Sequence, residues 1–346
     1  MTIEIRRCVA ADVPEVMRFV DEHWARGHVL ATSRALFDWQ YRSRHRDGYN
    51  VFLAVADDGC VVGMLGYIST ASFGAPLDRA TVWLALWKVR DRVGPPGLGL
   101  RLLRALTADE LHEAIGVLGI GDPRQAAMYR GMRFDAGSCA QLVVFDPTRD
   151  LSLAVVPPGT LRPQPAPGAS VLRSVEAGDL ERIIEEVDVD PARVPAKGAA
   201  YLRARFVDHP FYDYRLHVVA RADRPVGVLV SRIAEHEDAR AVRLVDFVGA
   251  PEELAECGTA VGSLIAEAGA EHADLWCAGF DPAIVERAGF ARVDPDGPIT
   301  VPSYFEPFVR RNTTLLYALR APGRPYAIFR ADGDQDRPNL LPAPAP

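Results

Sequence analysis

The sequence lacks the features that mark several large classes of protein. Its five cysteines are dispersed, with no Cys-x-x-Cys pair and no histidine at ligand spacing, so we expect neither a disulfide scaffold nor a metal site. It has no basic tract and a net charge of −7, so we expect no nucleic-acid partner. It has no apolar run of membrane-spanning length and no signal-like N-terminus, so we expect no membrane partner and a cytoplasmic location.

The length and composition are those of an ordinary globular protein. Hydrophobic residues make up 49% and charged residues 25% of the chain. A chain of 346 residues is too long for one average domain, so the length predicts two domains.

The most informative stretch is residues 81–106. Residues 82–89 are rich in β-branched and aromatic side chains, which predicts a buried strand. A Gly/Pro turn follows at 94–99, and then Leu98, Leu102, Leu103 and Leu106 recur at the spacing of an amphipathic helix. A glycine turn before a helix presents free N–H groups and the positive end of the helix dipole, which favours an anion such as pyrophosphate. The alternative is a plain strand-to-helix turn that binds nothing.

In this stretch the sequence resembles the GNAT family of acyl-CoA-dependent N-acyltransferases. The family motif Gln/Arg-x-x-Gly-x-Gly/Ala falls on Gly94-Pro-Pro-Gly97-Leu98-Gly99, with Gly94 where Gln or Arg is usual. Pro95 and Pro96 also remove two N–H donors. The resemblance implies that the turn binds the pyrophosphate of acetyl-CoA or another acyl-CoA. The implied cofactor-binding residues are Val89, Gly94, Gly97, Leu98, Gly99 and Leu100.

A second family motif, Asn-x-x-Ala-x-x-Leu-Tyr-x-x-x-Gly-Phe, resembles residues 122–134. Asp122 stands at the Asn, Tyr129 at the Tyr and Phe134 at the Phe, while Arg133 replaces the glycine. The resemblance implies that Tyr129 lies beside the CoA sulfur, where a phenol can donate a proton to a thiolate. Asp122 is a candidate catalytic base, and equally the N-cap of the helix that begins at Pro123.

The order of elements predicts two domains of the same kind. The opening at 3–20, a hairpin at 51–67 and the central strand are each repeated after residue 171. We therefore expect an α/β (α+β) fold with two tandem GNAT-like domains, each a mixed, mostly antiparallel sheet flanked by helices. The predicted boundaries are 1–148 for the first domain, 149–170 for a Pro-rich linker, 171–321 for the second domain and 322–346 for a tail. Residues 139–145 and 313–319 are predicted to close the first and second sheets respectively.

The second copy lacks the motif features of the first. Glu252, Glu253 and Glu256 stand where the glycine turn belongs, and their charges would repel pyrophosphate. Val285 stands at the tyrosine position. We expect a degenerate domain that supports the first one. In the tail, residues 324–330 are predicted to pair with a sheet edge, and the polar run 332–339 either binds substrate or forms a solvated turn.

Three residues are candidates for contact with the substrate. Trp39 is predicted to line the acceptor pocket, and Trp87 either lines it or belongs to the core. Trp83 and Trp87 have the same parity on the strand, so we expect them to face the same side. Asp246, a charge in an apolar run, needs a partner or a solvent-lined cavity and is a candidate acceptor contact.

The sequence thus predicts an acyl-CoA-dependent N-acyltransferase whose acceptor is a primary amine of a small molecule. An amino sugar is the first expectation, and an amino acid or antibiotic amine the second. The alternative from another class is an acyl-CoA-binding sensor or scaffold without turnover, and a third possibility is that neither domain binds CoA. The sequence predicts no oligomeric state.

Overall fold

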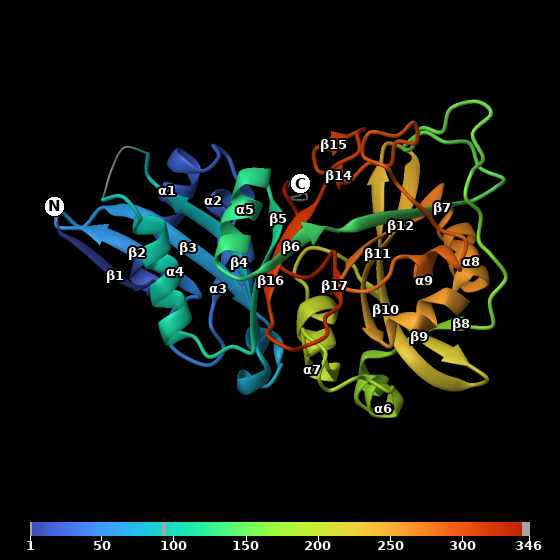
Figure 1. The fold of residues 1–346 in the computed structure, drawn as a ribbon, viewed down its shortest axis with the longest axis horizontal. Helices are drawn as coiled ribbons and strands as arrows, with labels where there is room; N and C mark the ends of the chain where they lie inside the picture. The colour runs from blue at the N-terminus through green and yellow to red at the C-terminus, as the bar shows by residue number, and fades with distance from the viewer. Residues whose placement is uncertain (1, 92–94, 341–346) are drawn as a thin grey trace, which may run out of the picture.

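The computed structural model describes residues 2–91 and 95–340, which form two sheets side by side with helices on their faces (Figure 1). The first sheet has the spatial order β1 (Ile3–Arg7), β2 (Val51–Ala56), β3 (Val61–Ser69), β4 (Thr81–Val89), β5 (Ala114–Ile120), β16 (Leu316–Arg320) and β6 (Asp135–Ser138). The second has the order β8 (Val171–Ser174), β9 (Arg215–Arg221), β10 (Arg224–His236), β11 (Ala239–Gly249), β12 (His272–Ala278), β7 (Ala140–Phe145) and β13 (Ala291–Arg292). We call the chain through β7 the first half and the chain from β8 onward the second half.

Helices cover both sheets. The first half carries α1 (Val13–His23), α2 (Val29–Thr32), α3 (Arg34–Tyr41), α4 (Leu98–Asp109) and α5 (Pro123–Gly131). The second half carries α6 (Leu180–Glu186), α7 (Ala199–Leu202), α8 (Gly258–Ala268) and α9 (Ala283–Glu286). The other described elements are short 3-10 turns, a π-helical segment at Arg203–Val207, a small hairpin of β14 (Tyr304–Phe305) with β15 (Phe308–Val309), and β17 (Ile328–Phe329). This mixed α/β architecture of helix-flanked sheets confirms the predicted fold class.

The two sheets share one pairing scheme. In each, the fourth and fifth strands are parallel and their neighbours are antiparallel. The parallel pairing is short: it runs from Thr81↔Ala114 to Leu84↔Val117 in the first sheet, and from Ala241↔His272 to Leu244↔Leu275 in the second. Both strands of each pair continue beyond the last paired residues, so each sheet opens a gap at that end.

The strands that close the two sheets are exchanged between the halves. β7 of the first half pairs with β12 and β13 of the second sheet, while β16 of the second half pairs with β5 and β6 of the first sheet (Figure 1). The prediction that 139–145 closes the first sheet and 313–319 the second was therefore wrong. Of the last two strands of the first half, only β6 (135–138) pairs within the first sheet. Because each sheet is completed by the other half, the two halves share one folding unit.

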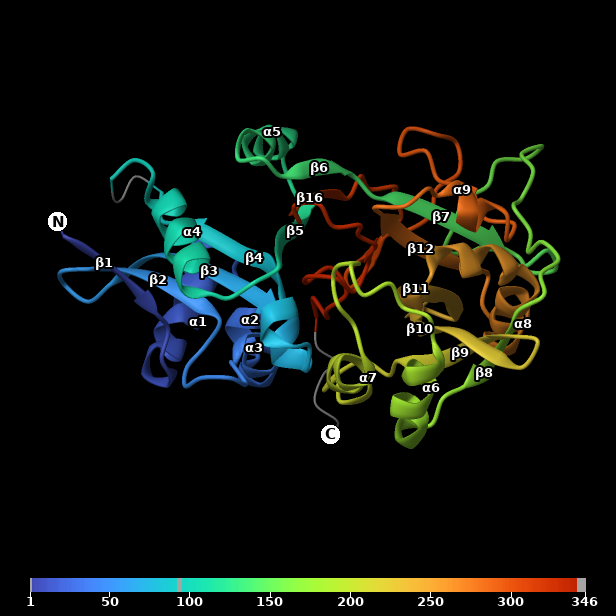
Figure 2. The ribbon, with the colours of Figure 1, turned by 60° about the horizontal axis from the view of Figure 1, so that its bottom comes forward.

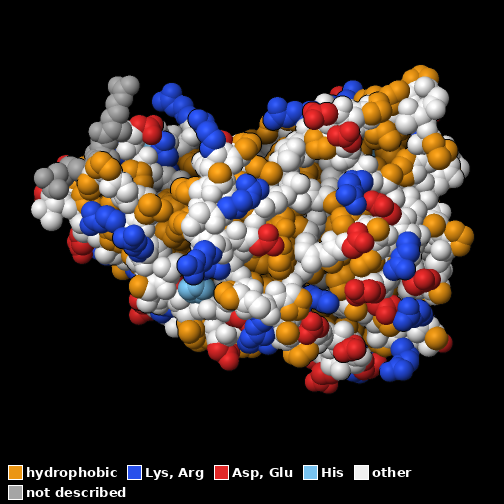
Figure 3. All heavy atoms as spheres, in the orientation of Figure 1, with side chains coloured by type: hydrophobic (Ala, Val, Ile, Leu, Met, Phe, Trp, Pro, Cys, Tyr) orange, Lys and Arg blue, Asp and Glu red, His pale blue; other side chains and the backbone are white. Residues whose placement is uncertain are grey.

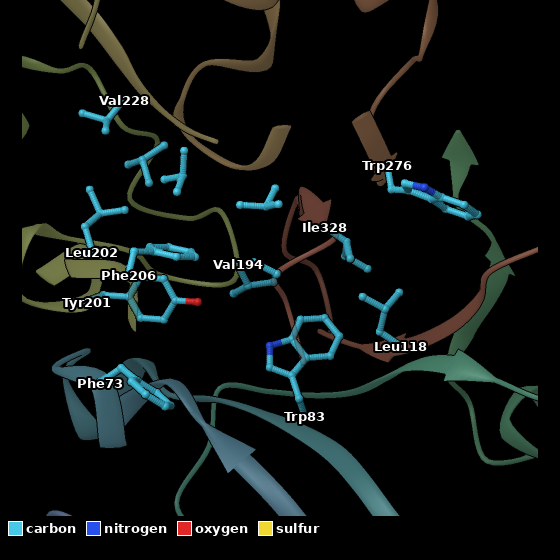
Figure 4. Packing of buried hydrophobic residues seen from close by; sticks show 14 of the residues in the cluster. Phe73, Trp83, Leu118, Val194, Tyr201, Leu202, Phe206, Val228, Trp276 and Ile328 are labelled. Carbon is cyan, nitrogen blue, oxygen red and sulfur yellow. The ribbon is translucent and has the colours of Figure 1, made fainter. Parts of the chain in front are cut away.

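The largest hydrophobic cluster lies between the halves. It joins Phe73 and Trp83 of the first half to Tyr201 and Phe206 of the second (Figure 4). Separate clusters lie under α4, under α1 to α3 and under α8. The interface is thus a core in its own right, and the position of one half relative to the other is set by packing.

The segment predicted as a linker is packed onto the second half. A Cβ on Gly258, the first residue of α8, would lie 2.2 Å from the carbonyl oxygen of Ala166. Gly168 donates its N–H to Thr259 Oγ1 at 3.1 Å, and Ala169 donates to Glu256 Oε2 at 3.2 Å. The proline-rich chain therefore covers the N-terminus of α8, which corresponds to the glycine turn before α4.

Arg133 and Gly289 hold the same position in the two halves and make a matched stability test. Arg133 has φ +64°, the left-handed conformation that disfavours side chains by about 1 kcal/mol. We expect Arg133→Gly to change the free energy of unfolding by under about 1 kcal/mol, on the stabilising side. Gly289 has φ +95°, and a Cβ there would lie 2.1 Å from the Gln164 carbonyl oxygen. We expect Gly289→Ala to destabilise by at least about 2 kcal/mol. Urea unfolding measures both changes. A Gly289→Ala variant with the wild-type urea midpoint would contradict the close approach of Gly289 to the Gln164 carbonyl.

Candidate active site between β4 and β5

The glycine turn and α4 adopt the geometry that the sequence predicts. Gly97 has φ +81° and ψ 8°, the values of the third residue of a type II turn, and the Leu98 N–H donates to the Pro95 carbonyl at 3.3 Å. Gly97 is the N-cap of α4, and its carbonyl accepts the Arg101 N–H at 3.0 Å. Gly94 lies outside the described residues.

Two backbone donors are left at this helix start. Gly99 and Leu100 are the second and third residues of α4, where an α-helix supplies no carbonyl partner for the N–H groups. Gly97 has no side chain that could cap them, and the Leu98 N–H is already used in the turn. The N–H groups of Gly99 and Leu100 and the positive end of the helix dipole therefore lie together, an arrangement that favours an anion. Binding of acyl-CoA by these residues stays a prediction.

A β-bulge in β4 shapes the gap beside this turn. Leu65 pairs with Trp87 but Tyr67 pairs with Leu84, so β4 places two residues opposite Gly66. A bulge leaves backbone groups unpaired and reverses the side-chain parity beyond it. Trp83 therefore packs in the cluster between the halves, whereas Trp87 packs in the cluster under α4. The prediction that the two tryptophans face the same side was wrong for this reason.

Trp87 lies at the mouth of the gap on the α4 face. A Cβ on Gly99 would lie 3.2 Å from Trp87 Nε1, so the indole rests against the first turn of α4. Its ring centroid is 6.5 Å from that of Tyr129. Val89, at the end of β4, is half-buried on the same face. The predicted cofactor-binding residues that the structure describes are thus gathered at one end of β4 and α4.

Tyr129 lies on the inner face of α5, which packs against β5, β6 and β16. The side chain is 4% exposed, and the structure gives its hydroxyl no hydrogen-bond partner among the described residues. Burial raises the pKa of Tyr129 well above its ordinary value. The phenol therefore keeps its proton at neutral pH and is free to donate it.

Asp122 is the N-cap of α5. Its Oδ1 accepts the Arg124 N–H at 2.8 Å, and its Oδ2 lies 2.7 Å from Arg124 Nη2. The hydrogen bonds from Arg124 lower the pKa of this exposed carboxyl, which makes it a weaker base. The predicted capping contact is present. A catalytic role of Asp122 stays a prediction.

The tail approaches the gap from the face opposite α4, and lies between the two halves in Figure 2. Gln335 Nε2 donates to the Leu118 carbonyl of β5 at 3.2 Å, just beyond the last parallel pair. Gly119, with φ +88°, leaves the space for it, since a Cβ there would lie 2.2 Å from Gln335 Nε2. Residues 332–339 are therefore packed in the interface and are not a solvated turn.

The corresponding gap of the second half is filled by the chain itself. β17 (Ile328–Phe329) pairs with the end of β12, and the Ala331 N–H donates to the Val245 carbonyl at 2.9 Å. The predicted pairing of residues 324–330 with a sheet is thus confirmed for β17, but its partner is the central strand β12 and not a sheet edge as predicted. Together with the chain that covers α8, this tail leaves the second half without an open counterpart of the site.

Asp246 belongs to this filled gap. Lys197 Nζ lies 2.6 Å from Asp246 Oδ1 and 3.0 Å from Asp332 Oδ2, and both carboxylates are fully buried. Lys197 is the partner that a buried charge requires. An acceptor contact of Asp246 stays a prediction, and in this structure the carboxylate is bound to Lys197.

Sequence reasoning did not find the residues that the second half brings to the first. Trp39 of α3 packs with its ring centroid 4.4 Å from that of His209, and Arg205 Cζ lies 4.9 Å from the Trp39 ring centroid. Arg205 Nη2 donates to the carbonyls of Ala331 and Gly333 at 3.0 and 2.7 Å. The one available signal was a pair of arginines, Arg203 and Arg205, within the otherwise apolar stretch 201–206.

Surface and composition features add little to the site. On the face shown in Figure 3, basic and acidic side chains are interspersed over both halves. Within residues 2–91 and 95–340, no three His, Cys, Asp or Glu side chains are grouped so that they could hold a metal ion. No described helix has both the length and the apolar composition needed to cross a membrane.

Solved structures with a similar fold are acyltransferases. No family model matches the sequence, and no curated protein matches it. A GCN5-related N-acetyltransferase from Anabaena variabilis matches with a TM-score of 0.55 and 11% identity, over 92% of this chain and 73% of that one. A probable N-acyltransferase from Enterococcus faecalis matches with a TM-score of 0.54 and 9% identity, over 92% and 72%.

A third match is N-myristoyltransferase from Saccharomyces cerevisiae, solved with myristoyl-CoA and inhibitors. Its TM-score is 0.50 and its identity 11%, over 93% of this chain and 81% of that one. The chain therefore has the fold of GCN5-related N-acetyltransferases.

Proposed function

We propose that this chain is an acyl-CoA-dependent N-acyltransferase whose catalytic site lies in the first half. It moves an acetyl or other acyl group from acyl-CoA to a primary amine of a small molecule. The observation that carries the proposal is the end of the β4–β5 pairing at Leu84↔Val117, with the N–H groups of the α4 start at one end and Tyr129 in the same cluster as Trp87.

The residues of the site divide the work of binding and chemistry. The N–H groups of Gly99 and Leu100 bind the pyrophosphate, and the pantetheine follows β4 past Val89 and Trp87 into the gap. Backbone groups that the bulge frees from the β3–β4 ladder bind the thioester carbonyl oxygen. In this assignment the acceptor amine reaches the thioester from the opposite face, where Trp39 and the tail lie.

The reaction needs no resident metal or redox group. The neutral amine nitrogen attacks the thioester carbonyl carbon, and the tetrahedral intermediate then collapses with cleavage of the C–S bond. The amine proton leaves to solvent. Tyr129 donates its proton to the departing thiolate and takes one back from solvent. The products are an amide and free CoA thiol.

We infer that the second half is a duplicated copy that supports the site and binds no acyl-CoA. Its α8 N-terminus is covered by residues 164–169, and its gap is filled by β17 and the residues that follow. Three glutamates lie before α8, where they would repel a diphosphate. We place the protein in the cytoplasm, where acyl-CoA is present.

A matched pair of variants tests the proposal. Leu100 is 41% exposed at the start of α4, so Leu100→Asp adds a charge beside the proposed pyrophosphate without disturbing the core. We expect calorimetric titration to show acetyl-CoA binding weakened at least about tenfold. The control is Thr259→Asp in the covered first turn of α8, where the side chain is exposed and a carboxylate can still accept the Gly168 N–H. We expect this variant to bind acetyl-CoA like the wild type.

Thiol release from acetyl-CoA with a panel of amines then separates the alternatives. Turnover supports the enzyme. Binding that is weakened in Leu100→Asp but yields no thiol with any amine supports an acyl-CoA sensor or scaffold. Absence of binding in the wild type overturns both.

A further inference from the structure

One group of three neighbouring buried hydrogen-bond donors at the interface of the halves has no acceptor among the described residues. They are Trp39 Nε1, Arg205 Nη1 and His209 Nε2, each without a partner among the residues that the structure describes. The three side chains are in contact: the Trp39 and His209 ring centroids are 4.4 Å apart, and Arg205 Cζ lies 4.9 Å from the Trp39 ring centroid. Buried polar atoms of folded proteins are almost always paired, so this group requires an explanation.

The hydrogen bonds of His209 fix its tautomer. Nδ1 accepts the N–H groups of Phe211 and Tyr212 at 3.1 and 2.9 Å, so it carries no proton. Burial, with the charge of Arg205 nearby, lowers the pKa of His209 to about 3, so the ring is neutral. The ring proton is therefore on Nε2, which is a donor. All three unpaired atoms are donors, and this is the pattern that an anion matches.

Among the described residues, Arg205 is held by two carbonyls and by the rings of Trp39 and Phe73, and not by a carboxylate. The residue is 3% exposed, and no carboxylate lies within ion-pair distance of it among the described residues. The acids of the neighbouring tail are engaged elsewhere: Asp336 by Arg232 and Arg330, and Asp332 by Lys197. A buried guanidinium without a counter-ion costs several kcal/mol, which a bound anion would recover.

This donor group lies beside the gap of the first sheet, on the face away from α4. Gly333 connects the two places: its carbonyl accepts from Arg205 Nη2, and a Cβ on it would lie 3.8 Å from the Trp83 Cβ. Trp83 pairs with Gly116, one residue before the parallel pairing ends. Figure 4 shows Trp83 directed into the interface opposite Phe73 and Tyr201. A small molecule bound here would lie near the thioester.

We propose that the acceptor is an amine that also carries a carboxylate, and that Trp39, Arg205 and His209 bind this carboxylate. The inference rests on the proposed function, since it concerns the acceptor of the same site. Arg205 supplies the charge and one N–H, and Trp39 and His209 supply the directional N–H donors. With the carboxylate held there, a short amino acid would present its amine toward the gap.

The test compares each acceptor with its own amide. Glycine, β-alanine and 4-aminobutanoate are assayed beside their primary amides for thiol release from acetyl-CoA, with the full chain. We expect at least one acid to exceed its amide about tenfold or more in kcat/KM, as for a charge-assisted contact worth 1.5–3 kcal/mol. Trp39→Phe keeps an aromatic ring and removes one N–H donor, so we expect it to lower the ratio of kcat/KM for the acid to kcat/KM for its amide. Arg205→Gln should abolish it.

Controls separate binding from folding. Arg182→Gln removes an exposed arginine of α6 and should leave the ratio unchanged. Arg205 also holds the tail, so the melting temperature of every variant is recorded. If Arg205→Gln does not fold, the acid-to-amide ratio of Trp39→Phe is the deciding result. A wild type that uses acids and amides equally, or a ratio that survives in Trp39→Phe, overturns the inference but leaves the proposed function standing.

The experiment also detects the opposite case, in which the proposed function fails but the anion site exists. If no amine gives thiol, the three carboxylates are titrated by thermal shift. A rise in the melting temperature of the wild type that is smaller in Trp39→Phe would support the anion site, even though the proposed function fails. Sulfate and phosphate are run in parallel, and a rise with these inorganic anions but with none of the carboxylates overturns the assignment to a carboxylate.

Discussion

Replacing Tyr129 with phenylalanine is expected to lower kcat for thiol release by about 10²-fold while acetyl-CoA binding stays unchanged. General-acid assistance to a leaving group contributes about 10²–10⁴-fold in enzymes. The Tyr129 hydroxyl has no partner among the described residues, so its removal leaves no buried group unpaired and opens only a small space between Trp87 and Phe134. The fold should therefore tolerate the change, and the loss should appear in kcat and not in the binding constant.

The pH dependence sharpens this expectation. Because burial raises the pKa of Tyr129, the acid form persists through the alkaline range, and no loss of activity from its ionisation is expected up to pH 9. The matched control is Tyr304→Phe, in the hairpin of the second half, which should keep wild-type kcat. A Tyr129→Phe protein with wild-type kcat would show that thiolate departure needs no acid here, and would remove Tyr129 from the mechanism.

Local sequence signals predicted the first half well where structure depends on neighbouring residues. The turn at Gly97, the helix that begins at Leu98 and the cap at Asp122 each follow from a few adjacent residues, and each is present. The positive φ of Arg133 is a further case, because the backbone keeps the conformation of the glycine that the family motif has there.

The sequence pattern did not predict the features that depend on contacts between distant parts of the chain. β7 and β16 are short apolar strands, and nothing in an apolar strand says which of two similar sheets it will join. The bulge in β4 adds one residue to an otherwise regular strand, and this alone separates Trp83 from Trp87. The donor group around Arg205 depends on contacts between residues far apart in the chain, so no spacing rule could have found it.

The asymmetry of the halves follows from what fills each gap. Both sheets open after four parallel pairs, and both carry a bulge at that point. In the second sheet the tail adds β17, and Lys197 joins Asp246 to Asp332 across the gap. In the first sheet the same tail reaches β5 through Gln335 and Gly333, but no described strand of the tail pairs there. The tail therefore fills the gap of the second sheet and lies beside the gap of the first. It is thus part of the proposed acceptor side.

The free energy of unfolding is expected to fall by at least about 3 kcal/mol between pH 7.5 and pH 5.0. His217 and His272 are 5% and 1% exposed, and burial lowers the pKa of each to about 4. Their pKa in the unfolded chain is about 6.5. Protons therefore bind the unfolded state first, so stability is complete above pH 6.5 and is lost as the pH falls toward 4. At pH 5.0 each histidine contributes a loss of about 2 kcal/mol.

Other groups change the size of this loss but not its sign. The pKa values of His28 and His209 are lowered in the same way, to about 4 and about 3, and add to it. Asp246 acts in the opposite direction, because burial raises its pKa to about 6 and the folded state takes up its proton. That single carboxyl offsets at most about 1.5 kcal/mol at pH 5.0, less than the two buried histidines remove.

His272 allows the cause to be isolated. Neither of its ring nitrogens has a partner among the described residues, and its ring centroid lies 5.6 Å from that of Phe145. His272→Phe keeps a ring in the site and removes the titration, so it should reduce the loss between the two pH values by about 2 kcal/mol. His23→Gln, on the surface of α1, is the control and should follow the wild type. Urea unfolding at the two pH values gives the four free energies for each comparison. Equal losses in His272→Phe and the wild type would mean that another group governs acid stability, and that the His272 imidazole accepts a proton in the folded protein.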